Sequence, residues 1–94
     1  MLADSANADI DEILSTVIPE NEEAAWQWYT TLHAKFSMLA DTPRLGRVRE
    51  DLLPSVYVFP FVRYLIFYEI RPDCIRIVHV VHGARDVGTM FARD

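Results

Sequence analysis

The stretch 62-VRYLIFYEIRPDCIRIVHVVH-82 is the part of this chain that most strongly indicates its fold. Its two halves are rich in the β-branched and aromatic residues that strands favour, and Arg71-Pro72-Asp73 between them is a turn signal. The pattern predicts an antiparallel hairpin of two strands over 62–71 and 74–82. Because both halves are almost continuously apolar, we expect central strands that are covered on much of both faces.

The segments before this hairpin predict a further strand and a turn. A short strand is predicted over 56–59, and Pro60 follows it. Proline cannot donate a backbone hydrogen bond, so a bend or a sheet edge is expected there. Further upstream, Pro43-Arg44-Leu45-Gly46-Arg47 begins with a residue that cannot continue a helix and contains a permissive glycine. This segment is predicted to separate a helical half from the sheet.

The first half of the chain has the three-and-four spacing of amphipathic helices. Five apolar residues recur in this way: Ile10, Ile13, Leu14, Val17 and Ile18. They predict a first helix over 5–18, which ends before Pro19. A second helix is predicted over 21–40, with Asn21 as its N-cap. A short connection favours an antiparallel helical hairpin, which packs on the antiparallel sheet as an α+β fold in one domain, residues 1–94.

The composition limits the classes of protein. With 94 residues the chain is long enough for one core, and its net charge is −5. Nucleic-acid-binding domains are generally basic, so direct nucleic-acid binding is not expected. The charge is uneven, however: acidic residues crowd the first quarter and most arginines come later. An acidic helical part and a more basic remainder are predicted.

Compartment and cofactors can also be judged from the composition. No apolar run approaches the roughly 20 residues of a membrane span, and the first residues lack the pattern of a signal peptide. The single Cys74 excludes an internal disulfide and is interpreted as a small strand residue rather than a reactive thiol. We therefore expect a cytoplasmic protein without membrane association and without a cofactor.

Four stretches in this order resemble the ParE/RelE toxin superfamily, and its ParE-like branch in particular. They are Ala8–Ile13, Pro43–Arg47, 59-FPFVRYLIFY-68 and 77-IVHVVHGARD-86. The resemblance implies a helical hairpin against a twisted antiparallel sheet. It also implies a cognate ParD-like antitoxin, whose flexible C-terminal segment folds onto the toxin. ParE members imply DNA gyrase as the target, and RelE members imply ribosome-dependent cleavage of mRNA.

The start of the chain departs from the pattern of this superfamily. Its members normally begin with a strand before the first helix, whereas only Met1 and Leu2 precede Ala3-Asp4-Ser5 here. Either the start is truncated or the sheet lacks a proper first strand. An edge of the sheet is then expected to be exposed and open to pairing with an antitoxin segment.

The candidate residues for catalysis form an incomplete set. Cleavage of RNA without a metal needs a base, an acid and cations around the phosphate. Arg63, His82 and Arg85 supply part of this set, but no Tyr or His follows His82. The chain is therefore interpreted as a gyrase inhibitor that is not an enzyme. A RelE-type endoribonuclease is the alternative, and a defective toxin retained for antitoxin binding is a third reading.

Six residues are candidates for partner binding: Trp26, Arg63, His82, Arg85, Phe91 and Arg93. Trp26 lies at the margin of the apolar stripe of the second helix, and aromatic side chains are enriched at interfaces. Arg63 is expected within a strand, either stacked on an aromatic ring or in contact with a partner. Arg85 with Phe91 and Arg93 is the candidate gyrase-binding patch.

A metal site is not expected from the three histidines. His79 and His82 are three residues apart on a predicted strand, so their side chains should point to opposite faces. His33 stands alone in the second helix.

Overall fold

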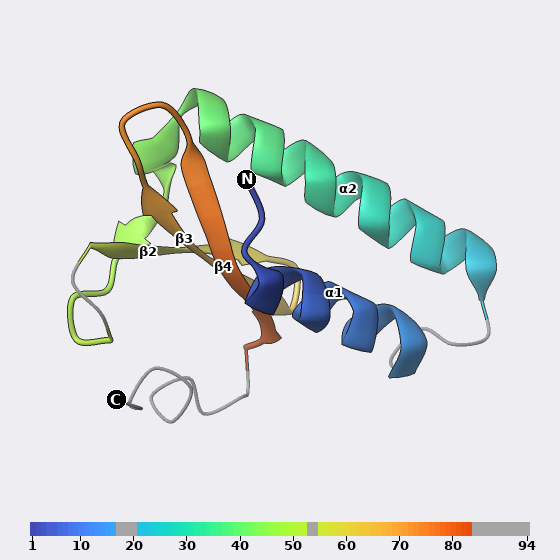
Figure 1. The fold of residues 1–94 in the computed structure, drawn as a ribbon. Coiled ribbons are helices and arrows are strands. Elements are labelled where there is room, and N and C mark those ends of the chain that lie inside the picture. Colours follow the sequence, from blue (N-terminus) through green and yellow to red (C-terminus); the bar gives the residue numbers. More distant parts are fainter. Residues whose placement is uncertain (17–20, 53–54, 84–94) are drawn as a thin grey trace.

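The structure is a computed structural model that describes residues 1–16, 21–52 and 55–83. Its elements are the helices α1 (Asp4–Thr16) and α2 (Glu22–Asp41), the 3-10 turn η1 (Pro43–Leu45), and the strands β1 (Arg47–Val48), β2 (Val56–Phe61), β3 (Tyr64–Ile70) and β4 (Ile75–His82). The strands form one antiparallel sheet in the order β1-β2-β3-β4, with the two helices beside it (Figure 1). The predicted α+β fold is confirmed.

Both helices begin close to the predicted residues. The Asn21 side chain accepts a 3.0 Å hydrogen bond from the Ala24 amide, which confirms the predicted N-cap of α2. The predicted first helix, 5–18, begins one residue earlier at Asp4, and its last two residues fall outside the described part of the chain. Within that part, no helix is both long and apolar enough to cross a membrane.

Two apolar clusters lie on opposite faces of the sheet. The larger cluster joins the helices to the sheet and contains Ile10, Leu32, Leu39, Ile66, Tyr68, Ile77 and Val80. The smaller cluster uses the alternate strand residues Val56, Phe67 and Val81, with Leu52, Val58 and Leu65 packed against it. Because side chains of a strand alternate between faces, this division confirms that β3 and β4 are covered on both faces. The expectation that both are central strands is wrong for β4, which is the last strand in the sheet order.

The outer edge of β4 is occupied by the first residues of the chain. Leu2 forms a parallel bridge with Ile77. The Ile77 amide donates to the Met1 carbonyl at 2.8 Å, and the Ala3 amide donates to the Ile77 carbonyl at 2.9 Å. The expectation of an exposed edge is therefore wrong around Ile77, because the short segment before α1 pairs there.

Side chains of α1 continue this edge where the backbone pairing ends. The Ser5 hydroxyl donates to the Val78 carbonyl at 2.6 Å. The Asp9 carboxylate accepts from the Val80 amide at 3.0 Å and lies 2.7 Å from Nδ1 of His79. The Val78 carbonyl and the Val80 amide at the edge are thus satisfied by side chains from the first half of α1.

The opposite edge of the sheet is formed by β1 and the uncovered end of β2. The predicted strand 56–59 continues through Pro60, which pairs with Leu65, so the expected interruption is wrong. The Arg49 amide donates to the Val56 carbonyl at 2.7 Å, so the backbone of Val56 faces β1. Backbone groups of successive strand residues point to alternate sides, so the backbone of Pro60 also points towards the β1 side of the sheet. Because β1 does not extend that far, the missing N–H of Pro60 costs no hydrogen bond. The predicted edge location is confirmed.

The turn between β2 and β3 replaces the predicted start of the hairpin strand. Phe61 pairs with Tyr64, and Val62 and Arg63 form a turn between them, so the strand begins at residue 64 rather than 62. Val62 has a φ of 56° and its side chain is 82% exposed. Positive φ is uncommon for a β-branched residue, which is why the sequence alone suggested a strand here.

The turn between β3 and β4 follows the prediction closely. The Arg71 amide donates to the Cys74 carbonyl at 2.7 Å, and β4 begins at Ile75. Cys74 is exposed in this turn, so its interpretation as a strand residue is wrong by one position. A register shift opposite Phe67 and Tyr68 leaves Val78 as the extra residue of a bulge, and regular pairing resumes at His79.

Candidate functional site

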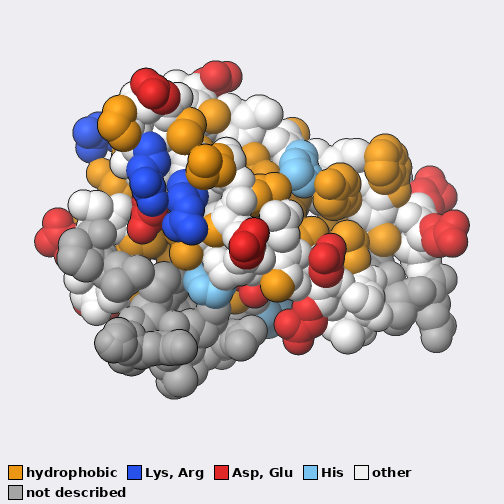
Figure 2. Space-filling model, in the orientation of Figure 1, with side chains coloured by type: hydrophobic (Ala, Val, Ile, Leu, Met, Phe, Trp, Pro, Cys, Tyr) orange, Lys and Arg blue, Asp and Glu red, His pale blue; other side chains and the backbone are white. Residues whose placement is uncertain are grey.

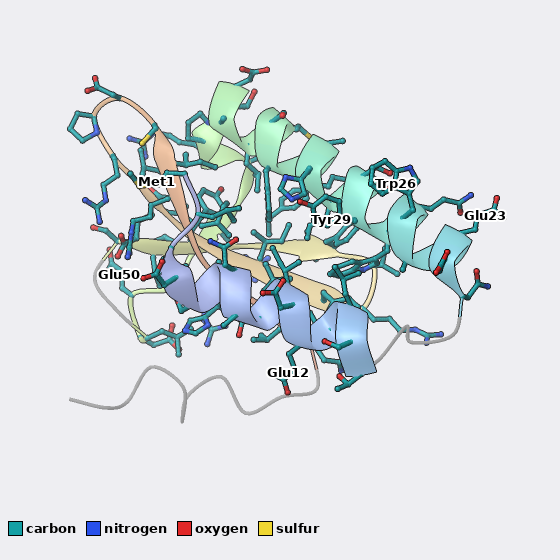
Figure 3. All side chains as sticks on the ribbon, turned by 45° about the vertical axis from the view of Figure 1, so that its right-hand side comes forward. Met1, Glu12, Glu23, Trp26, Tyr29 and Glu50 are labelled. Carbon is teal, nitrogen blue, oxygen red and sulfur yellow. The ribbon has the colours of Figure 1, made fainter. Side chains whose placement is uncertain are left out.

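An exposed aromatic patch lies on the helical hairpin. The Trp26 side chain is 65% exposed and Tyr29 is 36% exposed, and their rings stack with centroids 6.2 Å apart. Leu14 of α1 and Ala25 of α2 line the same shallow depression. Figure 3 shows Trp26 and Tyr29 projecting from the N-terminal half of α2. We call these four residues the hairpin patch.

The hairpin patch has the composition of a protein-binding surface. Large exposed aromatic groups are enriched at interfaces, and such groups supply much of the binding energy there. Sequence reasoning singled out Trp26 but placed Tyr29 in the buried stripe with Trp28 and Leu32. The spacing of three residues between Trp26 and Tyr29 would have revealed a second, outward stripe on the same helix.

A row of rings continues from the patch along α2. His33 lies between Tyr29 and Phe36, with ring centroids 4.4 Å and 5.0 Å away. Burial lowers the pKa of His33 below its ordinary value of 6.5. Its Nε2 is buried and makes no hydrogen bond to the described residues. The ring therefore acts as a neutral spacer near neutral pH.

Arg63 lies in a different environment from the one predicted. It is exposed in the β2–β3 turn, so its placement inside an aromatic strand is wrong. Its carbonyl accepts a 2.8 Å hydrogen bond from the Gly83 amide. This contact brings Arg63 and His82 to the same end of the sheet. Tyr64 lies at this end too, and the Trp28 ring of α2 packs edge-on against it, with ring centroids 5.4 Å apart.

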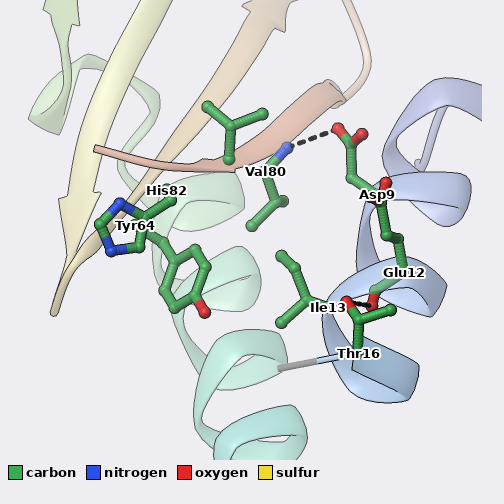
Figure 4. A pocket seen from close by; sticks show the side chains of 8 residues that line it. Asp9, Glu12, Ile13, Thr16, Tyr64, Val80 and His82 are labelled. Carbon is green, nitrogen blue, oxygen red and sulfur yellow. Dashed lines mark hydrogen bonds between the residues drawn. The ribbon is translucent and has the colours of Figure 1, made fainter. Parts of the chain in front are cut away.

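His82 lines a hollow between α1 and the end of β4. Its ring packs edge-on against Tyr64 with centroids 5.5 Å apart. Asp9 and Glu12 face the same hollow, which has a volume of about 290 Å³ (Figure 4). Two carboxylates oppose the approach of a polyanion, although His82 and Tyr64 could both transfer protons.

His79 and His82 lie on opposite faces of β4. His79 pairs with Phe67, a member of the smaller apolar cluster, whereas His82 pairs with Tyr64 of the larger one. Residues directly opposite in a sheet share a face, so the prediction that the two histidines diverge is confirmed. Among residues 1–16, 21–52 and 55–83, no group of three or more His, Cys, Asp or Glu side chains could hold a metal ion.

The remaining candidates cannot be placed. Arg85, Phe91 and Arg93 lie outside the described residues, so the tail patch stays a prediction. Of the six candidates, the structure brings Arg63 and His82 together at one end of the sheet, whereas Trp26 belongs to the hairpin patch on α2.

Comparison with known proteins identifies the family. The model of the ParE toxin of the type II toxin–antitoxin system, parDE, matches residues 1–87 of this chain. No curated protein matches the chain closely enough to add a named relative. The match covers both helices and all four strands that carry the surfaces described above. The chain therefore belongs to the ParE toxin family of type II toxin–antitoxin systems.

Proposed function

We propose that this toxin acts by protein–protein contact, with DNA gyrase as its target and a cognate ParD-like antitoxin as its inhibitor. The proposed action is cytoplasmic and needs no cofactor. The observation that carries the proposal is the hairpin patch, in which Trp26 and Tyr29 expose a stacked pair of rings on α2. Such a pair is a suitable anchor for a partner, because few residues supply most of an interface's free energy.

The antitoxin is proposed to cover the helical hairpin. A flexible segment that folds on binding can bury apolar side chains against Leu14, Trp26 and Tyr29. Backbone pairing at the outer edge of β4 is no longer part of this proposal, because Met1–Ala3 and the α1 side chains already occupy that edge.

Action without catalysis is supported by the charges around the hollow. His82 and Tyr64 face Asp9 and Glu12 there, so a phosphate group would meet two carboxylates. The net charge of −5 also repels a phosphate chain, and it does so over longer distances. Inhibition of gyrase by surface recognition requires neither a base nor an acid.

A RelE-type endoribonuclease remains the second candidate function. The observation in its favour is the position of Arg63 and His82 at one end of the sheet, beside Tyr64. A cation, an imidazole and a phenol are the group types that metal-free RNA cleavage uses. The third reading, a defective toxin, rests on the missing first strand, because Leu2 forms only an isolated bridge with Ile77 before α1 begins.

The two functions are separated by parallel assays on the purified toxin. We expect inhibition of supercoiling by DNA gyrase, relief of that inhibition by the antitoxin, and no cleavage of mRNA during in vitro translation. Cleavage of ribosome-bound mRNA with unchanged supercoiling would reverse the assignment. Deletion of Met90–Asp94 tests the proposed tail patch: gyrase inhibition should weaken while antitoxin binding stays intact.

A further inference from the structure

The charge of the molecule is divided between its two layers. The two helices carry seven acidic residues and one lysine, whereas residues 43–83 carry six arginines and four acidic residues. The helical layer thus has a formal charge of −6 and the sheet part has +2. On the face seen in Figure 2, the Lys and Arg side chains gather over the sheet end of the molecule. The predicted division of charge is confirmed.

A groove lies on the part of the sheet that the helices do not cover. Leu45, Arg47 and Arg49 line one side, and Val58, Pro60 and Leu65 of β2 and β3 line the other. Its volume is about 500 Å³. Val58 and Leu65 belong to the smaller apolar cluster, on the face opposite the helices. We call this feature the Arg47 groove.

Arg47 and Arg49 contribute differently to the charge of this groove. Arg49 makes two hydrogen bonds to the Asp51 carboxylate, at 2.9 and 2.8 Å, and this pair is nearly neutral. Arg47 is exposed, directly opposite Val58 in the register. It makes no ion pair at or below 4.0 Å with a described residue. Its guanidinium therefore offers a free bidentate donor beside an apolar floor.

We propose that the Arg47 groove binds an extended acidic segment of a partner protein. A carboxylate of that segment pairs with Arg47, and a neighbouring apolar side chain packs on Val58 and Leu65. Pro60 has no N–H and β1 contains only Arg47 and Val48, so side chains rather than strand addition carry the recognition. This surface is distinct from the hairpin patch and is independent of the function proposed above.

A peptide fits the groove better than a nucleic acid does. A polyanion gains affinity by neutralising many phosphates, whereas this groove offers one uncompensated guanidinium in a protein of net charge −5. A short segment with one or two carboxylates meets the local charge with less long-range repulsion than a polyanion does. The apolar residues of the floor then add the burial that a phosphate backbone cannot use.

The test uses the full-length toxin and three probes. The first is a labelled tetrapeptide with blocked termini that alternates aspartate and leucine and so carries two carboxylates. The second has asparagine for each aspartate, and the third is an oligouridylate. Binding is followed by amide chemical shifts, which detect weak association and locate it. We expect the acidic peptide to bind more tightly than its asparagine counterpart and to shift the amides of Val48, Val58 and Leu65.

Two variants with the same change of charge give the decisive comparison. Arg47→Glu should weaken binding of the acidic peptide by about tenfold or more, the loss expected for one charged hydrogen-bonded pair. Arg71→Glu, in the exposed β3–β4 turn outside the groove, should change it less than about twofold. Equal binding of the two peptides, equal losses in the two variants, or preference for the oligouridylate would each overturn the proposal. Neither antitoxin nor gyrase is present, so failure leaves the proposed function untouched.

Discussion

The hydroxyl of Tyr68 donates a 2.6 Å hydrogen bond to the carbonyl of Pro43, across the boundary between the sheet and the turn that leaves α2. The same oxygen accepts a 2.9 Å hydrogen bond from the Gly46 amide. Burial raises the pKa of Tyr68 above its usual value, so the phenol remains a donor at neutral pH. One buried side chain thus holds both ends of the turn against β3 and positions Arg47 at the start of β1.

Gly46→Ala is predicted to lower the free energy of unfolding more than Tyr68→Phe does. Tyr68→Phe leaves two polar groups without a partner and should cost about 1–2 kcal/mol in the free energy of unfolding. Gly46→Ala should cost more, because its new Cβ would approach the Tyr68 hydroxyl and lie 2.8 Å from the Val58 carbonyl. Gly83→Ala is the control, since among the described residues its Cβ meets only the Arg63 carbonyl, at 3.3 Å. Thermal unfolding gives the order, and equal losses at both glycines would contradict it.

Val62→Gly is predicted to stabilise the toxin. The φ of 56° is strained for a β-branched residue, and the side chain is too exposed to offset that strain by packing. Relief of the strain should exceed the entropy cost of glycine and raise the free energy of unfolding by about 0.5–1 kcal/mol. The same change at Val48, in β1, should lower it. Urea unfolding of both variants measures the difference, and a loss of stability in Val62→Gly would show that the turn is not strained.

Asp9→Ala is predicted to loosen α1 from β4. The change removes the acceptor of the Val80 amide and the contact with His79, at a cost of about 1–3 kcal/mol. Asp11→Ala, an exposed change of the same kind in the same helix, should alter stability by less than about 0.5 kcal/mol. Amide hydrogen exchange at Val80 should accelerate only in the first variant. Unchanged exchange there would mean that the carboxylate does not fasten the edge.

Trp26→Ala is predicted to weaken the complex with the antitoxin by about 1–2 kcal/mol while leaving the fold intact. The side chain is mostly exposed, so its removal costs little packing in the free toxin. Gln27→Ala, at the neighbouring exposed position, should leave the affinity unchanged. Titration calorimetry against the purified antitoxin measures both. An unaltered affinity in Trp26→Ala would place the hairpin patch outside the interface.

His33 is predicted to make the toxin less stable in mild acid. Burial lowers its pKa in the folded state, so the unfolded state binds more protons as the pH falls through 6.5. The contribution of this residue to stability therefore decreases from pH 7 towards pH 5. His33→Phe keeps a ring between Tyr29 and Phe36 but cannot titrate, so it should lose less stability over that range. Urea unfolding at both pH values tests this, and identical losses would argue against a role for His33.

Periodicity and local turn chemistry were sufficient for most elements of the fold. The apolar spacing predicted both helices, and Asn21 marked the start of α2 because its side chain can cap the first turn. The signal of Arg71-Pro72-Asp73 located the β3–β4 turn. In the candidate site, the exposure of Trp26 followed from its position at the margin of the helix stripe.

The missed features depend on contacts between distant residues. β1 contains only Arg47 and Val48, and its position depends on the hydrogen bond between Tyr68 and Gly46. Local propensity favours a strand at Val62, but the pairing of its neighbours forces a turn there. Pro60 stops a strand only where its N–H would be needed, which depends on where β1 ends. None of these relationships can be recognised in a window of neighbouring residues.

The pairing of Leu2 with Ile77 joins the segment before α1 to β4, between residues that are 75 positions apart in the sequence. Helices α1 and α2 leave the ribosome first, yet the strands that bury Ile10 and Leu32 follow only when β3 and β4 have emerged. A translating ribosome therefore carries a chain whose helices have no sheet to cover them. The core that joins the helical hairpin to the sheet therefore forms only after β4 has been synthesised.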